Sequence, residues 1–360
     1  MGEFRTRGQA AATAAVRRWV TAGEAPHALL FVGPEGCGKT TLALDLVAGL
    51  CCLAEDPASR PCRTCAACRK LEHGNHPDVH RLAPGGAGGQ IKIGDVRALL
   101  ADLALLPAEA RVRTAIIEQA HRLNPDAQNA LLKLLEEAPP GVVIVLTATA
   151  ESLLLETVVS RCQRIRLGPV PARDVAELLV EQGVADAPQA AALARAAGGR
   201  PGVALALAGD PDAVLAEGRM ARTLLDLAGA DRRTRLAAAT ELLADARRLV
   251  PGRAEEPEGE APTTRSASPA ERRLAALRLI ETWRALTRDV AVMALGLPDA
   301  ARRLDLADEL RTAASRIPGP GLVTFMGRLD HLAVAVEAYA NPELAIDALL
   351  LSWPRTTAEG

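Results

Sequence analysis

Aromatic residues and net charge are both scarce in this chain. Phe, Trp and Tyr make up 2% of the 360 residues, and the formal net charge is −2. A chain without a positive excess has no general electrostatic attraction to nucleic acid or to an anionic membrane surface. We therefore expect any contact with DNA to be local or to be shared with partner chains.

Long apolar runs are absent as well. No stretch reaches the 18 uninterrupted apolar residues of a candidate transmembrane helix, and the N-terminal residues lack the apolar core of a signal peptide. The sequence therefore favours a cytoplasmic protein. Five of the seven cysteines lie within residues 51–68, and in a reducing compartment such spacing indicates a metal site rather than disulfides.

The first half of the chain alternates between strand-like and helix-like patterns. Short apolar runs predict buried strands at 27–32, 79–82, 112–117, 142–147 and 164–167, and helical spacing recurs at 40–50, 93–106, 125–138 and 153–159. Strands that alternate with helices are typical of a mostly parallel, wrapped sheet. The fold class predicted for residues 1–168 is therefore α/β.

The second half reads as helix alone. Strand signals stop at Gly168-Pro169, residues 169–209 predict a small helical unit, and the readable pattern from 210 to 360 is helical. Residues 250–267 are rich in Pro, Glu, Gly, Ser and Thr, which predicts a disordered loop. The chain is thus expected to consist of three parts, at 1–168, 169–209 and 210–360.

Residues 33–40 fit the pattern G-x-x-x-x-G-K-[ST] between a predicted strand and a predicted helix. Glycines in such a loop let backbone N–H groups surround phosphate oxygens at a helix N-terminus. Lys39 would reach the β- and γ-phosphates of a nucleotide, and Thr40 would bind Mg²⁺. The expected nucleotide-binding residues are Gly33, Gly36, Gly38, Lys39, Thr40 and Thr41. An intact loop that is vacant, or that holds ADP without turnover, remains an alternative.

A second acidic position follows the strand predicted at 112–117. Glu118 stands where an Asp usually orients Mg²⁺, and Gln119 stands where a catalytic Glu would polarise the attacking water. An amide has no useful basicity, so we expect slow hydrolysis or none. The alternative is that both residues only end the strand.

Three cysteines follow one another at C-x-x-C spacing. Cys62, Cys65 and Cys68, with Cys52 as the fourth ligand, would supply four thiolates to a tetrahedral Zn²⁺. Cys51 is the alternative fourth ligand, and free buried thiols are the alternative to a metal. A site filled by four sulfur ligands would be closed and therefore structural.

These motifs occur together with two further segments. Residues 129–137 read Asn-Ala-Leu-Leu-Lys-Leu-Leu-Glu-Glu, and Ser160-Arg161-Cys162 stands between a predicted helix and strand. With the P-loop and the cysteine loop, they make the chain resemble the clamp-loader branch of the AAA+ family over residues 8–208. The resemblance implies a zinc-bearing nucleotide-binding domain, a three-helix lid and a helical collar that joins subunits into a ring.

The resemblance also implies roles and partners. Arg161 would be an arginine finger that completes the ATP site of a neighbouring subunit, and Thr149 would occupy the first sensor position. The partners would be the gamma/tau ATPase subunits and the delta subunit of bacterial DNA polymerase III, with the sliding clamp and primed DNA reached only through the assembly.

Three departures from the motor subunits favour a stator-like role. The acidic strand ends in Glu118-Gln119 instead of Asp-Glu, Gly202 falls where a sensor arginine is expected, and the chain ends soon after the collar. The expected function is a clamp-loader subunit with weak or absent ATPase activity of its own. The alternatives are an active gamma/tau-type ATPase and an unrelated zinc-containing P-loop NTPase.

Overall fold

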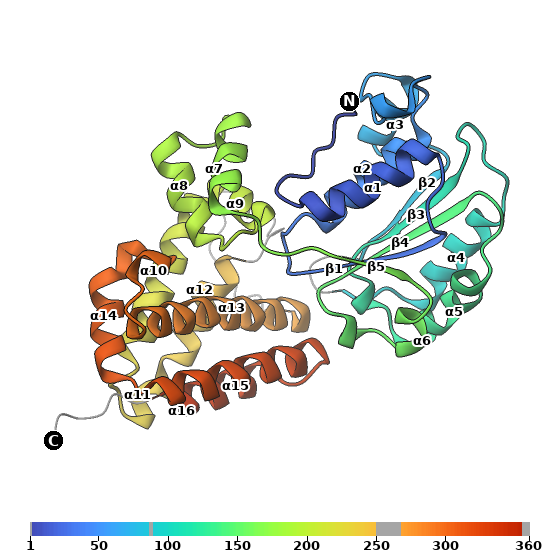
Figure 1. Cartoon of the computed structure of the whole chain (residues 1–360). Coiled ribbons are helices and arrows are strands. Elements are labelled where there is room, and N and C mark those ends of the chain that lie inside the picture. The colour runs from blue at the N-terminus through green and yellow to red at the C-terminus, as the bar shows by residue number, and fades with distance from the viewer. Residues whose placement is uncertain (1, 86–88, 250–267, 355–360) are drawn as a thin grey trace, which may run out of the picture. The chain divides into compact units, whose positions relative to one another are not determined.

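The computed structural model describes residues 2–85, 89–249 and 268–354, so the disorder expected at 250–267 lies outside the described residues. The chain divides into two compact units, the first formed by Met1–Gly85 and Gly89–Leu205, and the second by Ala206–Gly360 together with Gly86–Gly88 (Figure 1).

The first unit is built on a five-stranded parallel sheet. Its strands are β1 (Ala28–Val32), β2 (Val79–Leu82), β3 (Arg113–Ile117), β4 (Val142–Ala148) and β5 (Gln163–Arg166), in the order β2-β3-β4-β1-β5. The three central strands are buried along their whole length, as their apolar runs predict for a sheet covered on both faces. β2 and β5 form the two edges.

Helices cover both faces of this sheet (Figure 1). α4 (Ile93–Leu103), α5 (Pro125–Glu136) and α6 (Glu156–Val159) share one apolar core with Leu30 and Ile144. α1 (Ala10–Ala22) and α2 (Lys39–Cys51) share the other with Leu29 and Val145. Neighbouring residues of a strand thus enter opposite cores, as the pleat requires. The α/β fold class with a parallel sheet is confirmed.

Two helices of this unit fall where the sequence predicted none. α1 precedes the first strand, and α3 (Ala66–Glu72) lies inside the cysteine-rich segment that was expected to be a loop. α3 begins where the Sγ of Cys65 accepts a hydrogen bond from the backbone N–H of Cys68. A thiol thus caps the helix in place of the usual hydroxyl or carboxylate, which is why capping patterns did not reveal it.

The described residues after β5 are all helical or irregular. α7 (Ala172–Glu181), α8 (Ala187–Ala196) and α9 (Pro201–Ala208) fall within the range expected for the lid. The border between the two compact units, at Leu205 and Ala206, lies inside α9. Short 3₁₀ turns lie at Pro57–Ser59, Ala120–Arg122, Glu151–Leu153, Pro298–Ala300 and Leu304–Leu306.

The second unit is a helical bundle around three aromatic rings. Its helices are α10 (Pro211–Asp226), α11 (Arg232–Ala237), α12 (Ala239–Arg248), α13 (Pro269–Ala294), α14 (Ala307–Arg316), α15 (Gly319–Glu337) and α16 (Pro342–Ser352). The rings of Trp283, Phe325 and Trp353 contact one another at centroid distances of 4.8–5.5 Å. None of the described helices is long and apolar enough to cross a bilayer.

Candidate nucleotide and metal sites

The P-loop connects the end of β1 to the start of α2. Gly36 and Gly38 have φ angles of +76° and +102°, a region that favours glycine. Gly33 is required by space, because a Cβ at this position would lie 2.3 Å from the carbonyl oxygen of Leu167. The backbone of the loop therefore has the glycine-dependent shape that a phosphate cradle needs.

Lys39, Thr40 and Thr41 form the first turn of α2. The Nζ of Lys39 donates hydrogen bonds to the carbonyl oxygens of Gly33 and Pro34, each at 2.7 Å. Burial lowers the pKa of Lys39, since removal from water disfavours its charged form. A nucleotide phosphate would offer this amine charge-assisted hydrogen bonds, which are stronger than those to neutral carbonyl oxygens.

Glu118 lies beside this turn, because β3 ends at the same edge of the parallel sheet as β1. Its Oε2 accepts a hydrogen bond from the Thr40 hydroxyl at 3.3 Å. Its Oε1 accepts two more from Arg81 of β2, from Nε at 3.1 Å and from Nη2 at 2.5 Å. The two residues expected on the magnesium side are therefore together, and a cation from the protein already contacts the carboxylate.

Gln119 has a left-handed backbone, with φ +49° and ψ +51°. Its backbone N–H donates to the Oγ1 of Thr147 at 3.0 Å, which joins the ends of β3 and β4. Its side chain is exposed. The position expected for a general base thus carries a neutral amide that cannot accept a proton from water at neutral pH.

Two buried polar atoms near the P-loop have no partner within the described part of the chain. They are the Oγ1 of Thr149, which follows β4, and the Nδ1 of His121, which follows β3. Burial lowers the pKa of His121 to about 3, and the charge of Lys39 contributes to that shift. Buried polar atoms normally have hydrogen-bond partners, so these two are candidates to contact a bound phosphate.

The lid contacts the P-loop through backbone atoms. The N–H of Gly202 donates to the carbonyl oxygen of Gly36 at 2.9 Å. A Cβ on Gly202 would lie 3.1 Å from the Cα of Gly36, so a larger residue would need a local shift. The position expected for a sensor arginine is therefore packed closely against the P-loop backbone.

The N-terminal segment is fixed to the same region. Asp45 of α2 is fully buried and accepts hydrogen bonds from the backbone N–H groups of Arg5 and Thr6, at 3.1 and 2.9 Å. Asp45 also forms an ion pair with Arg63 of the cysteine-rich segment. The side chain of Gln9 donates to the carbonyl oxygen of Cys37 in the P-loop, at 3.2 Å. The buried carboxylate of Asp45 thus binds both the cysteine-rich segment and the N-terminal segment, and the latter contacts the P-loop through Gln9.

Four cysteines come together as predicted for a tetrahedral site. The Sγ atoms of Cys52, Cys62, Cys65 and Cys68 all lie within 4.8 Å of one another, and Cys51 is outside this group. Burial alone would raise the pKa of Cys62, but hydrogen bonds from Thr64 and the backbone of Cys65 lower it to about 6. Burial raises the pKa of Cys52 and Cys68, so these two thiols would lose their protons on binding a metal.

Arg161 follows α6 at the surface. Its Nε and Nη2 contact the Oε1 of Glu136, the last residue of α5, at 2.8 and 2.5 Å. Its Nη1 donates to the carbonyl oxygen of Thr157 at 2.9 Å. The side chain is 34% exposed, and its partners Glu136 and Thr157 both lie outside the P-loop. An exposed ion pair of this kind is worth about 0–1 kcal/mol, so a neighbouring chain can recruit the arginine at small cost.

The expected cofactors fit these sites unequally. The P-loop fits a phosphate, and the four-cysteine cluster can hold Zn²⁺, whose Zn–S bonds of about 2.3 Å place sulfur atoms roughly 3.8 Å apart in a tetrahedron. The Sγ atoms of Cys52 and Cys65 are 4.0 Å apart. The Mg²⁺ side fits poorly, because the positive guanidinium of Arg81 already pairs with the Glu118 carboxylate.

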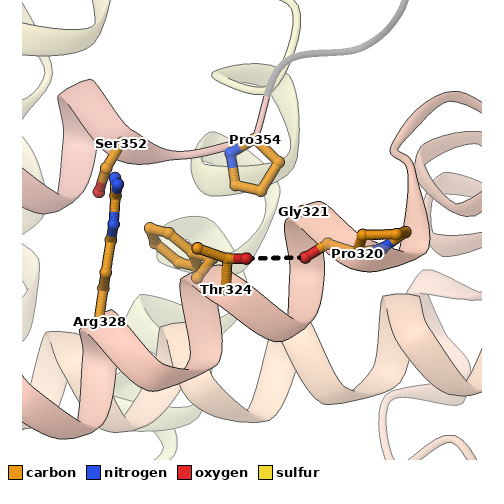
Figure 2. A pocket seen from close by; sticks show the side chains of 7 residues that line it. Pro320, Gly321, Thr324, Arg328, Ser352 and Pro354 are labelled. Carbon is orange, nitrogen blue, oxygen red and sulfur yellow. Dashed lines mark hydrogen bonds between the residues drawn. The ribbon is translucent and has the colours of Figure 1, made fainter.

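A separate pocket of about 350 Å³ lies on the second unit, between α15 and the end of α16 (Figure 2). Its lining includes Thr324, whose hydroxyl donates to the carbonyl oxygen of Pro320, and the long side chain of Arg328. One charged group and a hydroxyl that is already bonded to its own helix do not form a catalytic site. The P-loop is therefore the candidate functional site of the chain.

A P-loop after β1, with β4 inserted between that strand and the acid-bearing β3, defines a nucleotide-binding domain of the AAA+ type. Residues 8–171 match a family model described as DNA polymerase III, delta subunit. With the relatives described next, this match shows that residues 8–171 are similar to DNA polymerase III clamp-loader subunits, and the resemblance found in the sequence is confirmed.

Relatives of known identity include more than one subunit type. DNA polymerase III subunit delta' of Bacillus subtilis is 35% identical over 158 residues, which are 44% of this chain and 47% of the relative. DNA polymerase III subunit tau of Escherichia coli is 35% identical over 205 residues, 56% of this chain and 31% of the relative. The chain therefore spans less than half the length of these two relatives.

Similarity to solved structures is weaker. A gamma subunit-related protein of DNA polymerase III from Thermotoga maritima is 17% identical, with 95% of this chain and 98% of that chain covered and a TM-score of 0.42. The clamp loader delta protein of Bacillus subtilis is 12% identical, with 95% and 99% covered and a TM-score of 0.33.

Arg81 is the site residue that sequence reasoning missed. It stands in an edge strand, where a charged side chain is ordinary, and no motif includes it. The register that pairs Arg81 with Ile116 brings it to Glu118, two residues further along β3. A parallel alignment of the two predicted strand ends was the signal that could have revealed it.

Proposed function

We propose that this chain is a delta-prime-like subunit of a bacterial clamp loader. In this role it binds nucleotide weakly or statically and supplies Arg161 to the ATP site of a neighbouring gamma/tau subunit. The delta subunit, the sliding clamp and primed DNA would be reached through the assembly. The observation that carries the proposal is the contrast between a complete P-loop and an exposed amide, Gln119, at the general-base position.

The placement of Arg161 supports the role in trans. Its side chain is 34% exposed, and the hydrogen-bond partners of its guanidinium are Glu136, Thr157 and Ser160, none of which belongs to the P-loop. Arginine fingers supplied in trans accelerate phosphoryl transfer by about 10³–10⁵ in the best-measured NTPases. A subunit can therefore be catalytically essential to its neighbour without turnover of its own.

The test is ATP hydrolysis by a reconstituted loader on primed DNA with sliding clamp. We expect the chain alone to be nearly silent and the mixture with gamma/tau and delta to be strongly stimulated. Arg161→Ala should lower the rate of ATP hydrolysis at the neighbouring site by at least about tenfold. Arg161→Lys should recover little of that rate, because a lysine lacks the planar fork of N–H donors.

Arg164→Ala is the matched control, since Arg164 is an exposed arginine paired with Glu151 in the 3₁₀ turn that follows β4. If Arg161→Ala and Arg164→Ala leave the assembly equally active, the finger assignment is wrong. Nucleotide affinity of the chain itself should be unchanged by either substitution.

An active gamma/tau-type ATPase is the second candidate. The unbroken P-loop and the 35% identity to subunit tau favour it. Turnover by the isolated chain at a motor-like rate, abolished by Lys39→Ala, would establish this candidate in place of the first.

A further inference from the structure

We propose that Arg81 occupies the position of the magnesium charge beside Glu118, so that this P-loop binds nucleotide with little dependence on a divalent cation. The inference rests on the proposed binding of nucleotide by the P-loop and specifies the form of the ligand, a nucleotide free of metal.

The sheet fixes Arg81 in this place. β2 pairs with β3 in parallel register, with Arg81 opposite Ile116, and side chains in register project from the same face of a sheet. Ile116 packs in the core beneath α2, which is the helix that carries Lys39 and Thr40. The arginine therefore reaches the P-loop face because of strand pairing, and its position does not depend on a loop conformation.

The donor set for a metal is already bonded. In P-loop NTPases the metal is held by the hydroxyl of the loop and by an acidic residue of a neighbouring strand. In this chain the hydroxyl of Thr40 donates to one oxygen of Glu118, and Arg81 donates twice to the other. The Thr40 oxygen keeps its lone pairs while it donates, but a divalent cation beside Glu118 would meet the positive guanidinium of Arg81, which would have to move away for the cation to bind.

The charges of Glu118 and Arg81 also disfavour a divalent cation at this site. The side chain of Glu118 is 19% exposed and that of Arg81 is 48% exposed, so water only partly screens the attraction between their charges. A paired carboxylate offers little net negative charge to a divalent cation. A guanidinium has five N–H donors and can bind a carboxylate and a phosphate oxygen at once, so it can also neutralise a nucleotide.

The experiment measures the affinity of the full chain for fluorescent ATP and ADP analogues, in Mg²⁺ and in EDTA. We expect the wild-type dissociation constant to change by less than about threefold between the two conditions. In Arg81→Gln, Mg²⁺ should tighten ATP binding by about fivefold or more, since an exposed ion pair of up to about 1 kcal/mol no longer competes for Glu118. Arg81→Lys should keep the wild-type behaviour because it keeps the positive charge.

A second readout detects the metal itself. With ADP present, Mn²⁺ should give a bound electron paramagnetic resonance signal in Arg81→Gln and none in the wild type. Arg164→Gln, which removes an exposed arginine paired with Glu151, should match the wild type in both measurements.

The outcomes separate the two proposals. Binding that Lys39→Ala abolishes and that depends on Mg²⁺ equally in wild type and Arg81→Gln overturns the role of Arg81 and leaves nucleotide binding intact. Absence of nucleotide binding in wild type and Arg81→Gln alike overturns the nucleotide site, and this inference with it.

Discussion

His121 is the residue whose ionisation depends most clearly on the fold. Burial holds the pKa of its imidazole at about 3, whereas an exposed histidine has a value of about 6.5. The folded chain therefore keeps His121 neutral at pH values where the unfolded chain protonates it. Below about pH 6.5 the unfolded state binds the additional proton, so the free energy of unfolding falls as the pH falls.

We predict that His121→Gln weakens this pH dependence. Between pH 6 and pH 4 the wild type should lose up to about 1.4 kcal/mol of unfolding free energy per pH unit more than the variant. Urea titrations at several pH values measure this difference. His76 and His80, whose pKa values burial also lowers, contribute equally to both proteins. Parallel stability curves would show that His121 is not buried as a neutral group.

At this scale, motif residues could be predicted and their neighbours could not. Lys39, Thr40 and Glu118 belong to patterns whose spacing is set by the chemistry of phosphate and metal binding. Arg81 and Asp45 act across strands and helices distant in sequence, and their roles depend on register and helix packing. A single sequence carries no direct record of such contacts, except through the alignment of predicted strand ends.

At the scale of elements, the cysteine-rich segment and the N-terminal segment are held together by hydrogen bonds and an ion pair. Gly2 donates its N–H to the carbonyl oxygen of Ala58 at 2.8 Å, and Asp45 binds both segments. The boundaries of the strands were predictable to within one or two residues because apolar runs end at turns. α1 and α3 were missed because α1 has no side-chain cap and α3 is capped by a thiol.

We predict that Cys52→Ser abolishes zinc binding and that Cys51→Ser retains it. Cys52 belongs to the cluster of four sulfur atoms and Cys51, although buried, does not. Purified protein should contain one zinc per chain in the wild type and in Cys51→Ser, and close to none in Cys52→Ser. Hydrogen exchange should then rise in residues 52–72 and in residues 2–7, which the same contacts hold. Equal zinc content in the two variants would refute the ligand set.

At the scale of the whole molecule, two units have separate cores. The first unit contains Trp19, and the second contains Trp283 and Trp353, whose rings are in contact. Arg235, 1% exposed, donates to the carbonyl oxygens of Leu350 and Trp353 and so holds the end of α16 in the second core. The helical character of this half was predictable, but the buried arginine and its partners were not, because they meet only after the bundle has formed.

We predict that Trp283→Ala destabilises the second unit alone. Truncation of a fully buried tryptophan costs about 3–5 kcal/mol, and the side chain is 0% exposed. Calorimetry should show one unfolding transition displaced to lower temperature and one unchanged, with nucleotide affinity preserved. A uniform shift of all unfolding signals would mean that the two units unfold as one.

The two edge strands of the sheet also bear on the solubility of the chain. β2 presents His80 and Arg81 and β5 presents Arg164 and Arg166, so charged or titratable side chains line both open edges. Such residues discourage edge-to-edge pairing with a second sheet, the first step of ordered aggregation. Arg81 therefore serves colloidal stability as well as the nucleotide site, and a charge-removing change at this position makes one edge of the sheet more adhesive.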